Sequence, residues 1–414
     1  MDFNLSEEHL MIREACRKFA DRELKPRAAQ FDKNHEFPWD AVKKLGAMGI
    51  MGVVYPEDYN GAAMDYLCYA IAVEELSRGC ASTGVTVSAH NSLCLSPIFY
   101  FGTEEQKQKY LSRLTTGEWI GCFGITESGA GSDASGTRTT AVRENGNWVL
   151  NGAKTFITNG GVADVAVVMA ITTKGIGHKG LSMFIVEKGT PGFAVGKVEE
   201  KLGICASSTT ELVFTDCVIP EENLLGKEGQ GFSIAMHTLD GGRVGIAAQA
   251  LGIAQAAYED AIAYAKERIQ FNKPLSELQT IQNMIADMAT DIEAARLLVY
   301  QAAIMMNTHQ RQKYSKQCAM AKLFASEVSH RVTHKAIQIF GGYGYTKEFS
   351  VERYYRDARI TEIYEGTSEI MRVVIATNVL KGEGSAKKAT KDMTVVSKET
   401  DNAEKKSAAA GSSR

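Results

Sequence analysis

The sequence lacks the features that would assign it to a membrane, an oxidising compartment or a nucleic acid. No uninterrupted apolar run in its 414 residues approaches the roughly 20 residues that a membrane-spanning helix needs. Its eight cysteines are scattered without a Cys-x-x-Cys pair, which favours a reducing compartment over a disulfide framework or a zinc site. A net charge of −3, with 23% charged residues, gives no electrostatic attraction for nucleic acid or an anionic membrane.

The N-terminus also lacks a recognisable targeting signal. Residues 1–8 (MDFNLSEE) are acidic, with no Arg-rich presequence and no apolar signal segment, so we expect a cytoplasmic protein. With 44% apolar residues, a soluble chain of this length can bury two or three hydrophobic cores.

The pattern of apolar residues changes twice along the chain, which predicts three folded regions and a tail. Residues 1–121 and 229–383 have the spacing of helices, whereas residues 122–228 have the texture of strands. Residues 384–414 are rich in Lys, Ser, Ala and Thr and are expected to be disordered. Helices, then a β domain, then a helical bundle indicate an α+β protein rather than a doubly wound α/β sheet.

Individual stretches support this division. In the first region Met11, Ala15 and Phe19 recur at helical spacing, and in the second an Asn145-Gly146 turn precedes a strand. The expected buried strands are Val165–Ala170 and Leu181–Val186, and the expected faces of two long helices are Ile281, Met284, Ile285, Met288, Ile292, Ala295 and Leu298, and Ala321, Phe324, Val328, Val332 and Ile339.

Glu365 lies in the most informative stretch of the chain, between Ile363-Tyr364 and Gly366-Thr367. Apolar neighbours favour a raised carboxyl pKa, and such a group can remove a proton near neutral pH. Thr367 can cap the helix that follows, and Gly366 lets the backbone approach a ligand closely. These residues alone also fit a solvated glutamate at a helix boundary, so other motifs must decide.

Two motifs upstream suggest a phosphate and a flavin. Gly129 to Ser132 offers backbone N–H groups and a hydroxyl to phosphate oxygens, although a tight turn is the alternative, and the glycine spacing is not that of a dinucleotide fingerprint. Phe156 and Thr158 would face the same side of a strand, where a ring and a hydroxyl could contact an isoalloxazine. Core packing with a turn is the alternative here.

Together these stretches resemble the acyl-CoA dehydrogenase family over about residues 3–381, and most closely its short-chain, butyryl-CoA type. Both family signatures are present, in residues 124–133 (GITESGAGSD) and in residues 338–345 (QIFGGYGY) leading into Glu365. Residues 239–243 (LDGGR) and 268–271 (RIQF) also stand at family spacing. The resemblance implies an N-terminal helical domain, a central β-barrel-like domain and a C-terminal four-helix bundle.

The resemblance also implies residue roles. Glu365 matches the base that removes the α-proton of the acyl thioester, and its backbone N–H would bind the thioester oxygen. The positions that match FAD contacts, some supplied across a subunit interface, are Phe123, Ile125, Thr126, Phe156, Thr158, Arg268, Phe271, Gln279, Gln338, Ile339, Phe340, Gly341, Gly342, Thr367 and Glu369. The positions that match contacts to the CoA thioester are Ser132, Asp240, Arg243, Tyr364 and Gly366.

The implied activity is FAD-dependent dehydrogenation of a short-chain acyl-CoA to the trans-2-enoyl-CoA, as in fatty acid β-oxidation. Electrons would pass to an electron-transfer flavoprotein, and the implied assembly is a homotetramer. One alternative is the reverse reaction, that of an enoyl-CoA reductase, and another is a dehydrogenase of a branched or cyclic short acyl-CoA. A catalytically silent flavin-binding or CoA-binding scaffold is disfavoured because Glu365 and the flavin contacts are present.

Two adjacent glycines bear on the base and on the acyl chain. Gly242 occupies the position where some relatives carry the base, so Glu365 is expected to be the only base here. Gly241 beside it is expected to leave unusual room, which keeps the acyl-chain length open.

Other positions depart from the family or invite a second reading. Ser128 replaces a usual proline, which loosens a loop, and Cys205 replaces a usual arginine. His330 and His334 could bind a metal on a helix face but lack a third ligand, so a solvated face is the better interpretation. The alanine-rich residues 246–265 predict a tightly packed bundle helix.

Overall fold

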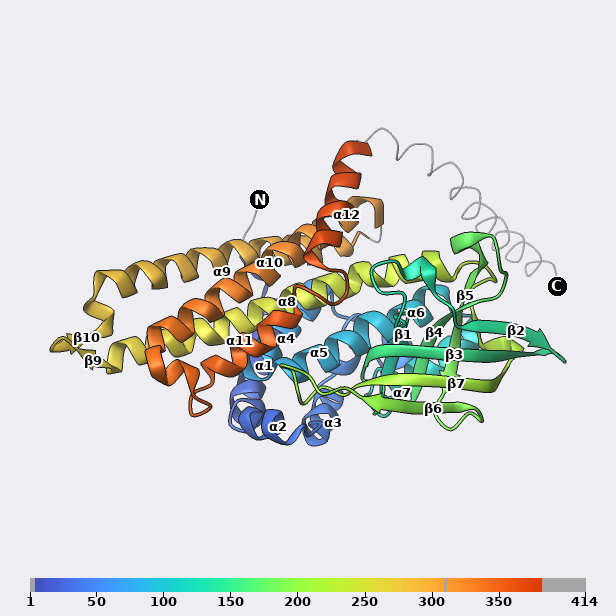
Figure 1. Ribbon diagram of the computed structural model, residues 1–414, viewed down its shortest axis with the longest axis horizontal. Helices are drawn as coiled ribbons and strands as arrows, with labels where there is room; N and C mark the ends of the chain where they lie inside the picture. Colours follow the sequence, from blue (N-terminus) through green and yellow to red (C-terminus); the bar gives the residue numbers. More distant parts are fainter. Residues whose placement is uncertain (1–3, 309–310, 382–414) are drawn as a thin grey trace, which may run out of the picture.

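The chain folds as an α+β protein in which a sheet lies at one end of a long helical body (Figure 1). The computed structural model describes residues 4–308 and 311–381. The predicted disordered tail, residues 384–414, lies outside the described residues. The expected fold class, with helices, a middle β domain and a helical bundle in that order, is confirmed.

The N-terminal region is helical, as predicted. Its helices are α1 (Glu7–Phe19), α2 (Ala28–Asn34), α3 (Trp39–Ala47), α4 (Tyr66–Gly79), α5 (Ala81–Ala89), α6 (Ser96–Phe101) and α7 (Glu104–Leu114), with π-helical turns at Ala20–Leu24 and His90–Leu95. The predicted face of α1 was partly wrong, because Met11 is 67% exposed and Ala15 is exposed too. The side chains that α1 buries against α4 are Ile12, Cys16 and Phe19.

The middle region forms one mixed sheet. Its strands are β1 (Gly121–Gly124), β2 (Thr140–Glu144), β3 (Asn147–Thr158), β4 (Val165–Ile171), β5 (Leu181–Glu187), β6 (Phe193–Val198), β7 (Thr209–Pro220) and β8 (Leu224–Leu225), in the order β6-β7-β3-β2-β4-β5-β8, with β1 parallel to β4. Asn145 and Gly146 both have positive φ, 49° and 75°, which is the backbone of a type I′ turn joining β2 to β3.

The sheet curls around a core made of its own strands. Trp148, Leu150, Phe184 and Phe214 lie in this core, whereas the other face of β4 and β5 packs against α6 and α7. Because β4 and β5 are buried on both faces, they read as continuous apolar runs, which is why both were predicted from the sequence.

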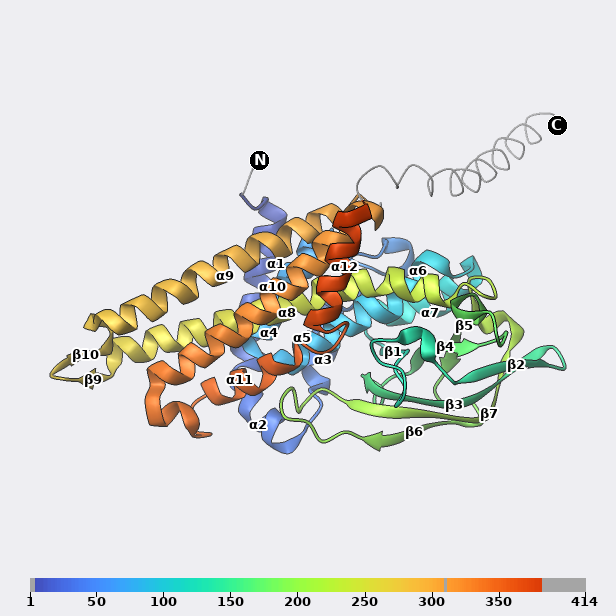
Figure 2. The ribbon, with the colours of Figure 1, turned by 45° about the horizontal axis from the view of Figure 1, so that its top comes forward.

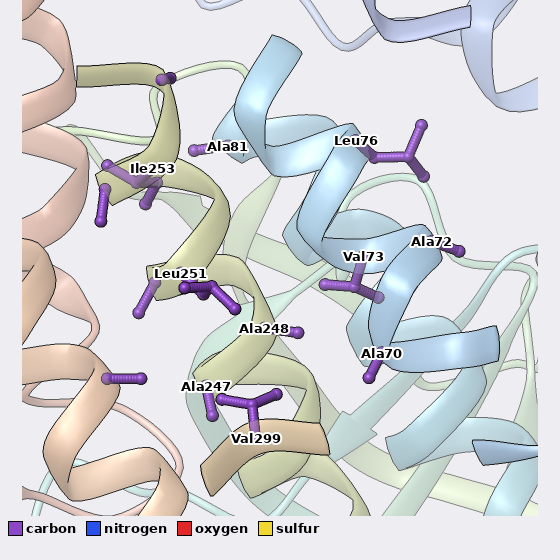
Figure 3. Packing of buried hydrophobic residues seen from close by; sticks show 14 of the residues in the cluster. Ala70, Ala72, Val73, Leu76, Ala81, Ala247, Ala248, Leu251, Ile253 and Val299 are labelled. Atoms are coloured by element: carbon purple, nitrogen blue, oxygen red, sulfur yellow. The ribbon is translucent and has the colours of Figure 1, made fainter. Parts of the chain in front are cut away.

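The C-terminal region is a helical bundle built on one central helix. Its helices are α8 (Gly231–Glu267), α9 (Gln279–Met306), α10 (Arg311–Phe340), α11 (Val351–Ile360) and α12 (Ser368–Lys381), and a ribbon of β9 (Ile269–Gln270) and β10 (Lys273–Pro274) joins α8 to α9. Figure 3 shows Ala247, Ala248 and Leu251 of α8 beside Val73 of α4 and Val299 of α9. The predicted close packing of this alanine-rich helix is confirmed, since small side chains let the backbones approach.

None of the helices in residues 4–308 and 311–381 combines the length and the apolar character that a membrane span requires. Figure 2 shows the bundle from a second direction, with α8 running between α9 and α10 on one side and α4 and α5 on the other.

Candidate active site

Glu365 lies in the turn between α11 and α12, in a backbone conformation that few non-glycine residues adopt. Its φ is 53°, and Gly366 follows with a φ of 99°, so two consecutive residues are left-handed. The hydroxyl of Thr367 accepts a hydrogen bond from the N–H of Ile370 at 3.3 Å. The predicted N-cap of α12 is therefore confirmed.

The carboxylate of Glu365 turns toward α8. A β-carbon at Gly242 would overlap its Oε2, so the glycine provides the space that the carboxylate fills. Oε2 is buried and has no hydrogen-bond partner in the described part of the chain. Burial raises the pKa of Glu365 to about 7, while the nearby charges of Lys322 and Arg243 act in the opposite sense.

Gly241 lies in the wall of a small cavity and leaves room for about one methyl group. A β-carbon at Gly241 would be in ordinary contact with Met306 at 3.6 Å and with Ser92 at 3.7 Å. The cavity beside it measures about 10 Å³, and its walls are Val54, Tyr55, Tyr66, Tyr69, Asn91, Ser92, Ser96, His237, Gly241, Met306 and Tyr314. Such a volume holds about one water molecule.

Lys322 of α10 is a site residue that the sequence analysis missed. Its ammonium is buried and donates to the carbonyl oxygen of Gly366 at 2.6 Å. A signal was available in the sequence, because Lys322, Ser326, Ser329 and Thr333 form a polar stripe along a helix whose neighbours are apolar. All four side chains are fully buried.

The predicted flavin contacts of the β domain gather around the ends of β1 and β3. Ile157 is buried, while Phe156 is 63% exposed and Thr158 is partly exposed. Phe156 lies at a register shift between β3 and β7 and has a φ of 58°. Thr126 follows β1, and its carbonyl accepts from the N–H of Thr155 at 2.8 Å.

Phe123 and Ile125 belong to the same segment as Thr126, and a buried ion pair holds it in place. Lys154 Nζ donates to Glu127 at 2.7 Å and to the carbonyl of Ile125 at 3.2 Å. Although burial acts to raise it, the Lys154 ammonium lowers the pKa of Glu127 to about 2. Phe123 is partly exposed, whereas the Ile125 side chain is buried.

The other predicted flavin contacts lie at the far end of the bundle, on the left in Figure 1. Arg268 stands at the end of α8, roughly 40 Å along the helix axis from Gly242 at 1.5 Å per residue. Phe271 is 84% exposed. The neighbouring residues Gln279, Gln338, Gly341 and Gly342 are exposed as well, whereas Ile339 and Phe340 turn into the bundle. One chain therefore does not bring both groups of residues to one place.

The predicted CoA contacts differ in how exposed their side chains are. Ser132 is exposed on the loop after β1. Asp240 and Arg243 are buried and pair with each other at 2.5 Å, and the hydroxyl of Tyr364 donates to Gln249 of α8. Of the five predicted contacts, Ser132 is exposed, Tyr364 and Gly366 are partly exposed, and Asp240 and Arg243 are buried.

The structure also shows the surroundings of three other residues that the sequence analysis singled out. Cys205 lies beside Asp32, a carboxylate that Arg356 already holds at 2.7 Å, so a second cation is not needed there. His330 Nδ1 lies 3.1 Å from Glu362 Oε1, which gives this histidine a partner in the turn before Glu365. Ser128 is exposed, as expected of a loop residue.

Three family models match the chain in sequence order. The N-terminal, middle and C-terminal domain models of acyl-CoA dehydrogenase match residues 6–118, 122–217 and 229–380. Together the three matches cover the chain from α1 to α12, apart from two short gaps between the domain models.

Individual relatives are similar along nearly the whole chain. The short-chain specific acyl-CoA dehydrogenase of Clostridium acetobutylicum is 55% identical over 381 residues, which is 92% of this chain and 100% of the relative. The butyryl-CoA dehydrogenase of Megasphaera elsdenii superposes with a TM-score of 0.90 at 48% identity, covering 92% of this chain and 100% of that one. A chain from a structure of the electron transferring flavoprotein of Acidaminococcus fermentans, a study of flavin-based electron bifurcation, gives 0.90 at 53% identity, with 92% and 100% covered.

Proposed function

The chain belongs to the acyl-CoA dehydrogenase family of FAD-dependent oxidoreductases, and we propose from this premise that it converts a short-chain acyl-CoA to the trans-2-enoyl-CoA. One observation carries the proposal. Glu365 stands at the position of the family's catalytic base and has a pKa of about 7, and its Oε2 is buried against Gly242 without a hydrogen-bond partner among the described residues. Such a group removes protons near neutral pH.

The turn around Glu365 supplies a base for the α-proton and a hydrogen-bond donor for the thioester oxygen. Its carboxylate takes the proton from the α-carbon, and the electrons of that C–H bond move toward the thioester oxygen. No backbone acceptor in residues 4–308 and 311–381 bonds to the Glu365 N–H, so it can donate to that oxygen. A donor placed where negative charge develops contributes several kcal/mol in comparable oxyanion sites. FAD held by the predicted flavin contacts would supply the acceptor for the β-hydride whose departure completes the double bond.

The residues present fit FAD. A flavin dinucleotide needs aromatic surface, hydroxyl groups, open backbone N–H groups and a cation for its pyrophosphate. Phe156 and Phe271 are exposed aromatic rings, and Arg268 is an exposed cation. A β-carbon at Gly341 or Gly342 would meet nothing within 4 Å, so ligand atoms can approach that backbone closely.

The cavity beside Gly241 is too small to hold an acyl chain, because its volume of about 10 Å³ holds about one water molecule. An acyl chain bound there must displace side chains of the wall, and a short chain displaces fewer of them than a long one. Met306 and Tyr69 form part of this wall. This supports a butyryl-sized substrate over a long-chain one, while a compact branched chain stays open to test.

The two distant groups of flavin residues support a homotetramer, in which the far end of one bundle completes the cofactor site of another. An electron-transfer flavoprotein as electron acceptor is supported by the similar chain from the structure of the electron transferring flavoprotein of Acidaminococcus fermentans. We also propose a cytoplasmic location and a place in fatty acid β-oxidation. All eight cysteines are free and buried, in keeping with a reducing compartment.

Anaerobic titration of the yellow holoprotein tests the function directly. Butyryl-CoA should bleach the flavin absorbance, and octanoyl-CoA should do so much less at the same concentration. A panel with isobutyryl-CoA would reveal a branched specificity, and reoxidation of the reduced protein by crotonyl-CoA would measure the reverse reaction. A colourless protein that takes up no FAD, or a flavin that no acyl-CoA bleaches, would contradict the proposal.

A further inference from the structure

Three polar side chains of α10 bond to the turn that carries Glu365. Lys322, Ser326 and His330 follow one another at four-residue spacing, so they lie on one face of the helix. The contacts are Lys322 Nζ to Gly366 O at 2.6 Å, Ser326 Oγ to Thr361 O at 2.8 Å, and His330 Nδ1 to Glu362 Oε1 at 3.1 Å.

Lys322 differs from the other two because it brings a charge into the protein interior. Its side chain is fully buried, and no carboxylate of the described residues forms an ion pair with it. Burying an unpaired ammonium is unfavourable for folding, so a lysine is a poor choice if the position serves packing alone. Ser326 makes an equivalent bond to the same turn without a charge.

The backbone that Lys322 contacts is itself strained. Glu365 and Gly366 have φ values of 53° and 99°, and a left-handed non-glycine residue persists only where the surroundings hold it. The carbonyl of Gly366, which accepts from Lys322, belongs to the second of these two residues. The bond therefore fixes the peptide between Gly366 and Thr367, the second peptide after the base.

The charge of Lys322 also acts on the Glu365 carboxylate. Arg243 of α8 is the second cation that influences this carboxylate, but Asp240 pairs with it at 2.5 Å and offsets its charge. The other titratable groups nearby are Tyr69 of α4, Tyr364 of the same turn, and Glu362 and Glu369, which act on Lys322. Lys322 is thus the cation near Glu365 that has no carboxylate partner in the described part of the chain. It lowers the pKa of Glu365, against the effect of burial.

We infer that Lys322 is a positioning residue for the catalytic base: it holds the turn through the Gly366 carbonyl, and its charge favours the ionised form of the Glu365 carboxylate. The inference rests on the proposed function, in which Glu365 removes the α-proton. The Lys322 ammonium thus both holds the turn and acts electrostatically on the carboxylate, whereas Ser326 only holds the turn.

The test compares Lys322→Met with Ser326→Ala in the holoprotein, by the pH dependence of flavin bleaching with butyryl-CoA under anaerobic conditions. Removing a positive charge disfavours the carboxylate, so the apparent pKa of the base should rise by about one unit or more in Lys322→Met. Bleaching below the wild-type pKa should then be about tenfold slower or more. The two profiles should converge above the Lys322 pKa of about 8, where the wild-type ammonium is also neutral. Ser326→Ala should keep the wild-type pKa.

A Lys322→Met profile with the wild-type pKa would overturn the inference, and so would an equal shift in Ser326→Ala, because that would assign the effect to a loosened turn. If Lys322→Met does not fold, Lys322→Arg takes its place in the test. Because this variant retains the positive charge, the apparent pKa of Glu365 should stay at the wild-type value, and a shifted pKa would contradict the inference. Infrared titration of the Glu365 carboxyl band, identified by its loss in Glu365→Gln, measures the same shift without turnover. If wild-type flavin is not bleached by any acyl-CoA, the proposed function fails, and the infrared shift still decides the role of Lys322.

Discussion

Two left-handed turns of the helical region are held in opposite ways. The turn at Glu365 and Gly366 is enclosed by the chain's own helices, with Gly242 on one side and Lys322 on the other. The turn at Phe271, between β9 and β10, has a similar φ of 53°, yet its ring is 84% exposed. The first turn is complete within one chain, whereas the second presents its ring to something outside the chain.

The difference separates what a single chain provides from what an assembly provides. The base needs a low-dielectric surrounding that sets its pKa, and such a surrounding requires a packed core. The distant part of a cofactor needs surface contacts, which another subunit can supply as well as the same chain. Substitutions at the two turns should therefore affect different properties of the enzyme.

The largest effect is expected at the enclosed turn from Glu365→Gln. The amide cannot accept the α-proton, and loss of general-base chemistry lowers the rate by roughly 10²–10⁴-fold or more. Rapid-mixing measurements of bleaching by butyryl-CoA give this rate, and FAD content and acyl-CoA binding should stay at the wild-type level. A variant with nearly normal turnover would mean that another residue removes the proton.

Gly242→Ala should have the next largest effect, because its methyl group would take the place of Glu365 Oε2. Misplacing a reacting group by about 1 Å can lower a rate by roughly 100-fold. Gly241→Ala is the matched control, since its methyl group would meet Met306 and Ser92 at ordinary contact distances. Similar kcat/KM losses in the two variants would show that helix substitution itself, rather than displacement of the base, is responsible.

Substitutions near the exposed turn should change how tightly the protein binds FAD. Arg268→Ala should weaken FAD binding about tenfold or more, the usual worth of a charge-assisted hydrogen bond, while saturating FAD restores turnover. Fluorescence titration of the apoprotein with FAD measures the change. Lys273→Ala removes a cation from the same ribbon at a position without a predicted flavin contact, and it should bind FAD normally. Equal weakening in both variants would indicate a general charge effect.

Removing the tail should have the smallest effect. Its composition cannot bury enough surface to offset roughly 1–2 kcal/mol of entropy per ordered residue, so deletion after Glu383 should leave FAD content, turnover and subunit assembly unchanged. The flavin absorbance measures FAD content, its bleaching by butyryl-CoA measures turnover, and analytical ultracentrifugation measures subunit assembly. Smaller assemblies or lost flavin would mean instead that residues 393–396 dock on a neighbouring subunit.

Local patterns in the sequence predicted much of this molecule. The hairpin at Asn145-Gly146, the doubly buried strands β4 and β5, and the cap at Thr367 depend on neighbours in the chain, so they could be recognised before any tertiary contact was known. The family was likewise recognisable, because its signatures are contiguous in sequence, and the proposed base Glu365 follows one of them.

The errors concern contacts between distant segments. Lys322 belongs to a polar stripe that is visible in the sequence, but its bond to the Gly366 carbonyl depends on how α10 packs against the turn. The buried face of α1 consists of Ile12, Cys16 and Phe19, so two of its three positions lie one residue after Met11 and Ala15. In both cases a partner from another element decides the contact, and the spacing of residues along the chain does not identify that partner.

The overlap between Gly242 and Glu365 also limits how such a site can change over generations. A lineage that moved its base from the turn to α8 would need a larger side chain at position 242 and a smaller one at position 365. If position 242 changes first, the existing base is displaced, and if position 365 changes first, the base is lost. Either order of substitution therefore includes an intermediate protein with reduced activity. The two codons are thus expected to change together, and a survey of variants should find glycine at 242 wherever the glutamate at 365 is kept in this backbone.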